Sequence, residues 1–199
     1  MNLLTKLSCI SVGAVFISLG IVNTAQAVTV TLESASLGST GQSAGFSIIP
    51  SQFLGWKFQL TNTLQVTDIG GHLGSNSPNN EIFGAIVSLS GPNALPQGNL
   101  SQPGEVLAAT TLNPGFSSNP GFSSNDVTVP LSVTLNPGNY ALVFGSGLFG
   151  ASGDAYMPFN NQDFPGSSYF VSNVDNGFTW IGDGISRVRF VVKGEISCR

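Results

Sequence analysis

His72 is the residue on which any nucleophilic site in this chain would depend, because it is the one histidine in the sequence. A Ser-His-Asp or Cys-His centre needs an imidazole as its base. The glycines of the segment GGHLG are typical of oxyanion-hole loops, but the sequence contains no G-x-S-x-G motif. A single histidine without a pair of accompanying cysteines also argues against the usual zinc sites. We therefore interpret His72 as a structural residue at a strand end, within a glycine turn.

Carboxylates are the second group of side chains that could do chemistry. The ten acidic residues could include the pair that a glycosidase needs, but a sequence does not measure their separation. Four aspartates recur in loops rich in glycine and asparagine: Asp154, Asp163, Asp175 and Asp183. Such oxygen ligands suit calcium, yet the spacing of an EF-hand or of a nonapeptide repeat is absent. We expect turn-forming aspartates and no cofactor, with a structural calcium ion as the alternative.

Basic residues gather near the C-terminus, where Arg187, Arg189 and Lys193 should project from one face of the last strand. Because charged residues make up only 8% of the chain, this cluster could bind an anionic polysaccharide or surface polymer. Alternatively, charged side chains on a last strand discourage edge-to-edge pairing with another molecule. We favour the second interpretation and keep the three residues as candidates for a carbohydrate contact.

Aromatic side chains could stack on sugar rings. Trp56 and Tyr140 lie in strong strand patterns and are expected in the core, whereas Trp180 and Tyr169 lie near loop-rich ends and are the better surface candidates. Phe116 and Phe122 occupy equivalent positions in a tandem copy of NPGFSS over residues 113–124. They could form a stacking ledge, but we favour an expanded surface loop, because loops tolerate insertions. A six-residue period is also too short for a solenoid or propeller.

The N-terminal segment predicts export. Residues 1–27 contain Lys6, an apolar run over residues 7–22 and the small-residue motif Ala25-Gln26-Ala27, which together form a secretory signal peptide. The alternative is a retained anchor helix, because the apolar run approaches the lower limit of a membrane span. We expect cleavage to leave residues 28–199 as a single domain without a membrane span. The protein should be secreted, extracellular or bound to the cell surface, with the periplasm as an alternative location.

Composition limits the classes of partner. Loss of Lys6 from the six basic residues leaves five against ten acidic residues, which argues against nucleic acid as a partner. Charged residues reach 8%, compared with about 25% in ordinary soluble domains. Hydrophobic residues at 41% and fourteen phenylalanines make disorder a poor explanation for this low charge. Cys198 is left alone after cleavage, so no intrachain disulfide is expected.

The hydrophobic pattern predicts an all-β fold. Residues 127–135 alternate apolar and polar side chains, Asn136-Pro137-Gly138-Asn139 indicates a type II turn, and the nearly continuous apolar run 140–144 is typical of a central strand. Eight to eleven short strands are expected, at residues 28–32, 56–60, 64–69, 82–89, 106–112, 127–135, 140–144, 154–159, 168–171, 178–180 and 186–192. The long loop 91–104 suits a crossing between two sheets. We predict a two-sheet antiparallel sandwich, jelly-roll-like, with no helix after the signal segment.

Several segments resemble a family of secreted β-sandwich proteins. The features are LGWKFQLTN followed by VTDIGGH, then EIFGAIVSL, VLAATTL, the V-x-L-x-P-G-x-Y stretch at 133–140 and the final RVRFVVKGEI. They are similar to those of bacterial, notably cyanobacterial, proteins that carry a PEP-CTERM sorting tail. After Ile196, such a protein would continue with a Pro-Glu-Pro motif, an apolar helix and a basic end, whereas this sequence continues Ser-Cys-Arg. We hypothesise that an ancestor carried the tail.

The resemblance implies an exported surface or extracellular-matrix protein without enzyme activity and with a link to exopolysaccharide. We therefore expect a non-enzymatic protein whose partners are extracellular polysaccharide or other matrix proteins, bound through weak carbohydrate contacts. One alternative is an enzyme that acts on polysaccharide through a carboxylate pair. The other is a purely structural, self-associating coat protein.

Overall fold

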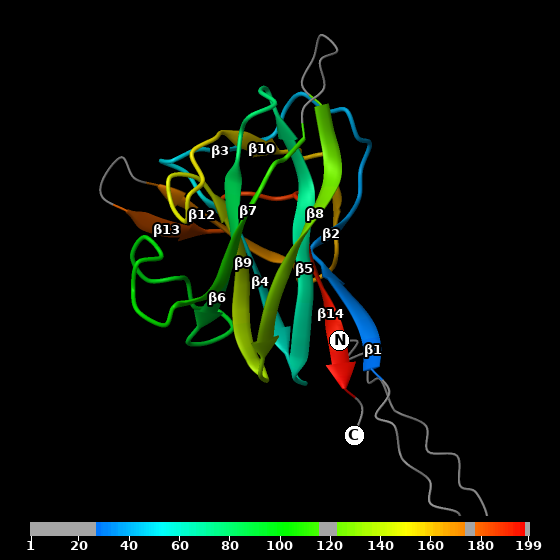
Figure 1. The fold of residues 1–199 in the computed structure, drawn as a ribbon, viewed down its shortest axis with the longest axis vertical. Coiled ribbons are helices and arrows are strands. Elements are labelled where there is room, and N and C mark those ends of the chain that lie inside the picture. Colours follow the sequence, from blue (N-terminus) through cyan, green and yellow to red (C-terminus); the bar gives the residue numbers. More distant parts are fainter. Residues whose placement is uncertain (1–26, 116–122, 174–177, 198–199) are drawn as a thin grey trace, which may run out of the picture.

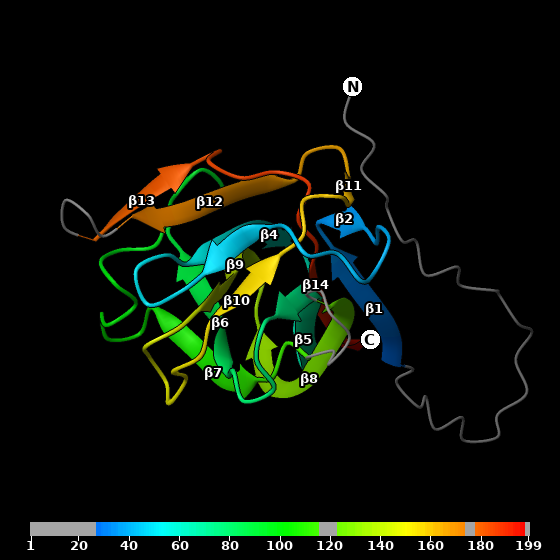
Figure 2. The same ribbon diagram turned by 90° about the horizontal axis from the view of Figure 1, so that it is seen from above.

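A computed structural model describes residues 27–115, 123–173 and 178–197, and these residues form an all-β sandwich of two six-stranded antiparallel sheets. The first sheet has the order β1-β14-β5-β10-β3, with β8 also paired to β5; the second has the order β13-β12-β4-β9-β6-β7; β11 and β2 form a small third sheet. Figure 1 and Figure 2 show the two large sheets stacked face to face. The strands are β1 Ala27–Glu33, β2 Ala35–Ser36, β3 Phe46–Ile48, β4 Leu54–Leu60, β5 Leu64–Ser75, β6 Ile82–Leu89, β7 Val106–Leu112, β8 Ser123–Leu135, β9 Gly138–Gly145, β10 Ala155–Met157, β11 Gln162–Asp163, β12 Ser168–Asn173, β13 Thr179–Gly182 and β14 Phe190–Ser197.

Strands β8 and β9 confirm the pattern of their sequences. In β8 the side chains from Val127 onward alternate between inward and exposed positions, and in β9 every residue from Tyr140 to Gly145 is buried. The two burial patterns differ because β8 has one face toward the core and one toward solvent, whereas β9 lies between β4 and β6 and is covered on both faces. Among the described residues, no helix is long and apolar enough to cross a membrane.

Two predictions about connections are wrong. Loop 91–104 joins β6 to β7, which pair with each other in the second sheet, so it does not cross between sheets. The tight turn after Leu135, by contrast, does cross between the sheets, because β8 pairs with β5 in the first sheet and β9 with β4 and β6 in the second. Gly138 already belongs to β9 and is absent from the described glycines with positive φ, so the expected type II turn does not form.

The main core lies between the two sheets. Its largest side chains come from strands of both layers and include Leu54, Phe144, Ile69 and Phe190, all fully buried. Phe144 and Phe190 stack across the interface with ring centroids 5.3 Å apart. Each such side chain contributes roughly 2 kcal/mol or more of hydrophobic stabilisation, so packing is sufficient to fix how the two sheets face one another.

A second apolar cluster covers the outer face of the second sheet. Phe53, Phe83 and Phe170 are buried there beneath loop residues such as Leu100 and Leu148. The long loop after β6 therefore covers the outer face of this sheet, and the loop is long because it spans that face. Because this sheet is covered on both faces, its central strands β6 and β9 are apolar almost throughout.

Candidate functional site

His72 lies inside β5 and is fully buried, not at a strand end in a turn as predicted, because β5 continues to Ser75. Its Nδ1 lies 2.9 Å from Oδ1 of Asn161, and its Nε2 lies 2.8 Å from Oγ of Ser124. The amide nitrogen of Asn161 donates to two backbone carbonyls, those of Pro158 and Arg187, so its Oδ1 must be the acceptor. His72 is therefore protonated on Nδ1 and accepts at Nε2 from the Ser124 hydroxyl.

This Ser-His-Asn arrangement has the connectivity of a nucleophile, a base and an orienting group. The hydroxyl of Ser124 also accepts a hydrogen bond from the backbone N–H of Gln42, and Ser124, His72 and Asn161 are at most 1% exposed. Burial lowers the pKa of His72 below its usual value, and Arg189 adds to this, against the hydrogen bond to Asn161 and the charge of Asp126. The network connects segments of the chain that are far apart in the sequence.

The predicted basic face does not exist as a single surface. Arg189 is buried, and its guanidinium binds Glu33 at 2.9 Å, Asp126 at 3.0 Å and the backbone oxygen of Ala35. Arg187 precedes β14 and has a φ of 59°, so the strand that was expected from residue 186 begins at Phe190. Lys193 is the member of the trio that lies within the strand, half-buried opposite Thr31. The prediction fails because a backbone in the left-handed region breaks the alternation of side chains.

Tyr169 is buried at 4% exposure, so the expectation that it offers a surface for stacking is wrong. Its hydroxyl lies 2.6 Å from Oδ1 of Asp163 and also within hydrogen-bonding distance of the backbone oxygens of Ser34 and Val188. Burial raises the pKa of Tyr169 above its usual value, and the hydrogen bond to Asp163 adds to that effect. Tyr169 and Asp163 thus fix the turn before β14, where Asp163 also accepts the backbone N–H of Arg187.

Trp180 is half-buried and packs into the outer apolar cluster. Its ring meets those of Phe170 and Phe178 edge-to-face at 5.2 Å, and its indole N–H donates to the backbone oxygen of Gly98 at 2.7 Å. The indole therefore attaches the loop after β6 to the end of β13. Phe116, Phe122 and Asp175 lie outside the described residues. Within the described part of the chain, no cluster of three or more acidic, histidine or cysteine side chains is placed to hold a metal ion.

A groove beside β4 brings together a different set of side chains. Strand β12 pairs with β4 only as far as Ser168 and Lys57, so the end of β4 from Phe58 onward is left without a partner on that side. The groove that results has a volume of about 430 Å³ and continues into a hollow of about 440 Å³ that reaches β1. We call this combined depression the β4 groove. Its lining comes from β1, β4 and β9, from the end of β6 and the start of β12, and from the loops at 92–93 and 164–167.

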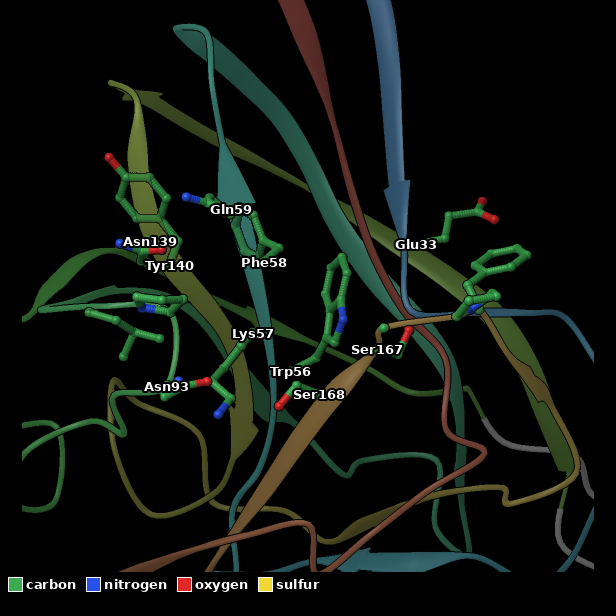
Figure 3. Close-up of a pocket in the computed structure, with 15 residues that line it drawn as sticks. Glu33, Trp56, Lys57, Phe58, Gln59, Asn93, Asn139, Tyr140, Ser167 and Ser168 are labelled. Carbon is green, nitrogen blue, oxygen red and sulfur yellow. The ribbon is translucent and has the colours of Figure 1, made fainter. Parts of the chain in front are cut away.

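The apolar wall of the β4 groove is aromatic. Half-buried Phe58 stacks on Trp56 with centroids 5.3 Å apart and lies 5.8 Å from Tyr140. Trp56 and Tyr140 are themselves buried in the main core, as expected, at 5% and 8% exposure. Phe164 is 42% exposed, which is unusual for so large an apolar side chain. Figure 3 shows the indole of Trp56 projecting from β4 toward β14 and β1, whereas Lys57 projects to the other side of the strand. The groove thus follows the edge of β4 that β12 leaves unpaired, and side chains from both faces of the strand line it.

The polar groups of the β4 groove are mostly neutral. Gln59 and Asn93 are exposed, and Ser168 is half-buried at the end of β12. The side-chain oxygen of Asn139 is buried and has no hydrogen-bond partner among the described residues. Glu33 also lines the groove, but its carboxylate is bound to Arg189. The arrangement combines flat aromatic surface with amides and hydroxyls, which suits a ligand that is apolar on its faces and hydroxylated at its edge.

Part of this site could be predicted from the sequence. Trp56 was expected in the core, but nothing in the strand pattern indicates that β12 begins only opposite Lys57 and leaves a groove beside Phe58. Phe164 was not singled out, although FPGS carries a signal: Gly166 has a φ of 86° and the N–H of Ser167 donates to the carbonyl of Phe164. Proline and then glycine in the two central positions indicate a type II turn. Such a turn at the surface places Phe164 where it can remain exposed.

Comparison with known protein families finds no family model that matches this chain. A search of curated proteins finds no match either.

Proposed function

We propose that this protein is an exported, non-enzymatic, jelly-roll-like β-sandwich that acts at the cell surface or in the extracellular matrix and binds polysaccharide through the β4 groove. The observation that carries the proposal is the combination, in one groove, of exposed Phe164, half-buried Phe58 and the exposed amide of Gln59. Aromatic rings pack against the C–H faces of sugars, while amides exchange hydrogen bonds with their hydroxyl groups. This replaces the loop and C-terminal residues expected from the sequence as the contact surface.

Electrostatics favour a neutral polymer over an anionic one. The chain carries a formal net charge of −4. Arg189 already forms ion pairs with the carboxylates of Glu33 and Asp126. Lys57 is the basic residue that lines the described part of the β4 groove, opposed there by Glu33. Attraction of a polyanion would need an excess of positive charge, so we propose a neutral hexose polymer as the ligand class.

The enzyme alternative finds less support in the groove. Hydrolysis of a glycosidic bond by two carboxylates needs both of them free to face the sugar. Glu33 and Asp126 approach the same arginine from two strands and are held by it. Among the described residues that line the β4 groove, Glu33 is the one acidic side chain. The proposal is therefore a binding protein.

Affinity electrophoresis of the full chain, expressed with residues 1–27 and purified after export, tests the proposal. Gels containing mixed-linkage β-glucan, galactomannan or dextran should retard the protein in at least one case. Phe164→Ala removes the exposed ring and should weaken retardation roughly tenfold, since a stacked aromatic contributes about 1 kcal/mol beyond its buried area. Phe149→Ala is the matched control, because Phe149 is equally exposed, at 43%, in a loop away from the groove. Equal retardation of both variants, or none of the native protein, would overturn the proposal.

A further inference from the structure

A second groove lies at the end of the sandwich where β3 and β10 pair. It has a volume of about 390 Å³, and its lining comes from the loop 43–45, from β3 and β10 and from Asn76 and Phe159. Figure 1 shows β3 and β10 at the end opposite the turn that joins β8 to β9. We call this depression the β10 groove. It shares no lining residue with the β4 groove.

The walls of the β10 groove include two aromatic rings held in fixed positions. The ring of Tyr156 lies over Gly74, where a Cβ would be only 2.4 Å from the ring, and its hydroxyl donates to the backbone oxygen of Gln42 at 2.7 Å. Phe159 is 46% exposed and packs edge-to-face against Phe46, with centroids 5.9 Å apart. Because both rings already contact other parts of the protein, little conformational entropy is lost in ordering them when a ligand binds.

Polar groups of complementary kinds lie beside these rings. Asp154 and Tyr156 are two residues apart on β10 and its approach, so their side chains leave the same face of the sheet. Asp154 is exposed, and no hydrogen bond or ion pair occupies its carboxylate within the described part of the chain. The amide of Asn80 donates to the side-chain oxygen of Asn76 at 3.2 Å, which leaves the nitrogen of Asn76 as a donor. Ser47 adds a hydroxyl opposite Tyr156.

This set of groups matches one sugar ring. A free carboxylate can accept from two neighbouring hydroxyls at once, an amide nitrogen can donate to a third, and an aromatic ring covers the apolar face. A metal ion is a poorer fit, because no group of three metal-binding side chains occurs among the described residues. An acidic sugar is disfavoured by Asp154, whose charge would repel it.

We infer that the β10 groove is a second binding site for a hexose unit of a neutral polysaccharide, with Asp154 and Asn76 as its polar contacts and Phe159 as its stacking platform. The inference rests on the proposed function and extends it. Two sites built on different strands of one sandwich allow one molecule to hold two chains, or two points of one chain, and so to gain avidity without new contacts. The protein is then a cross-linker of neutral polysaccharide.

The test compares variants of the two grooves by affinity electrophoresis of the full chain in mixed-linkage β-glucan, galactomannan and dextran. Asp154→Asn keeps the shape of the side chain but removes its charge, and charge-assisted hydrogen bonds are about twice as strong as neutral ones. We expect roughly tenfold weaker retardation for Asp154→Asn and for Phe159→Ala. Asp183→Asn is the control for the first, because Asp183 is exposed elsewhere with a φ of 60°, which asparagine tolerates. Phe149→Ala is the control for the second.

The two proposals fail in different ways. If Phe164→Ala weakens retardation while Asp154→Asn and Phe159→Ala match their controls, the β10 groove is not a site and the β4 groove stands. If only the β10 variants weaken retardation, the β10 groove stands and the β4 groove does not. Absence of retardation of the native protein in all three gels would overturn both. Partial loss in each set, with complete loss when Phe164→Ala and Phe159→Ala are combined, is the result that both proposals predict.

Discussion

Buried polar side chains tie together segments of this protein that are far apart in the chain. Arg189 joins β1 and β8 through Glu33 and Asp126, and His72 joins β5 to Ser124 and Asn161. Removing one partner of such a set would leave the others buried without a hydrogen bond, which costs about 1–3 kcal/mol for each neutral group. Residues that looked chemically active in the sequence are thus explained by packing and satisfaction of hydrogen bonds.

Stability should depend on pH through His72. Its pKa is lowered in the folded protein, whereas the unfolded chain titrates near 6.5. The unfolded state therefore binds more protons below pH 6.5, and the free energy of unfolding falls as the pH decreases from there. The neutral imidazole is required because protonated Nε2 would have to donate to Ser124, whose hydroxyl proton would then lose its acceptor. Asp126 opposes this effect and Arg189 reinforces it.

Urea denaturation at pH values between 6.5 and 5 measures this fall, and NMR of the imidazole follows the titration directly, since the chain has one histidine. The expected result is an imidazole that stays neutral in the folded protein below pH 6.5, together with a decreasing denaturation midpoint. An imidazole that titrates at 6.5 or above in the folded state, with a constant midpoint, would contradict the assignment.

The alternation of apolar and polar residues predicted most strands, because it depends only on which face of a strand is exposed to solvent. This holds for β8, with its exposed Thr128 and Ser132, and for the apolar run of β9. Sheet membership was harder to predict, since the turn after Leu135 and the loop 91–104 have similar compositions of proline, glycine and asparagine. Whether a connection stays within one sheet or crosses to the other depends on where the strand that follows it pairs, and that pairing is a property of the whole topology.

Gly55 on β4 leaves space for the aromatic ring of a buried core residue on the neighbouring strand. Gly55 is paired with Phe170 on β12, and a Cβ at Gly55 would lie 2.1 Å from that ring. Gly55→Ala should therefore destabilise the protein by roughly 2 kcal/mol or more, because Phe170 is fully buried and has to move. The quantity to measure is the urea midpoint at constant m value.

Gly182→Ala is the control for Gly55→Ala. Gly182 is paired with the same Phe170 from the other side, on β13, but a Cβ there would meet nothing within 4 Å. Its stability should change by no more than about 0.5 kcal/mol. Equal midpoints for Gly55→Ala and the native protein would show that the second sheet tolerates a wider separation of β4 and β12 than this packing implies.

At the scale of the whole molecule, both grooves lie where the pairing between two strands is incomplete. β12 begins beside Lys57 and leaves one edge of β4 uncovered from Phe58 onward, and β10 pairs with β5 only at Tyr156 and Gly74. The sequence identified aromatic residues and argued against zinc and nucleophilic sites, but it did not place Phe164 or Phe159 at grooves. Side chains such as Trp180, Tyr169 and Arg189 show why, since their burial depends on segments distant in the chain.

The proposed function requires that a sugar chain bind in the β4 groove. The direct measurement is two-dimensional NMR of the isotope-labelled protein during titration with a soluble hexasaccharide fragment of whichever neutral polymer retards it. We predict that the largest shifts occur at the exposed side-chain amides of Gln59 and Asn93, with a second set at Asn76. A fragment that saturates the protein without shifting any resonance of the β4 groove would contradict the central claim.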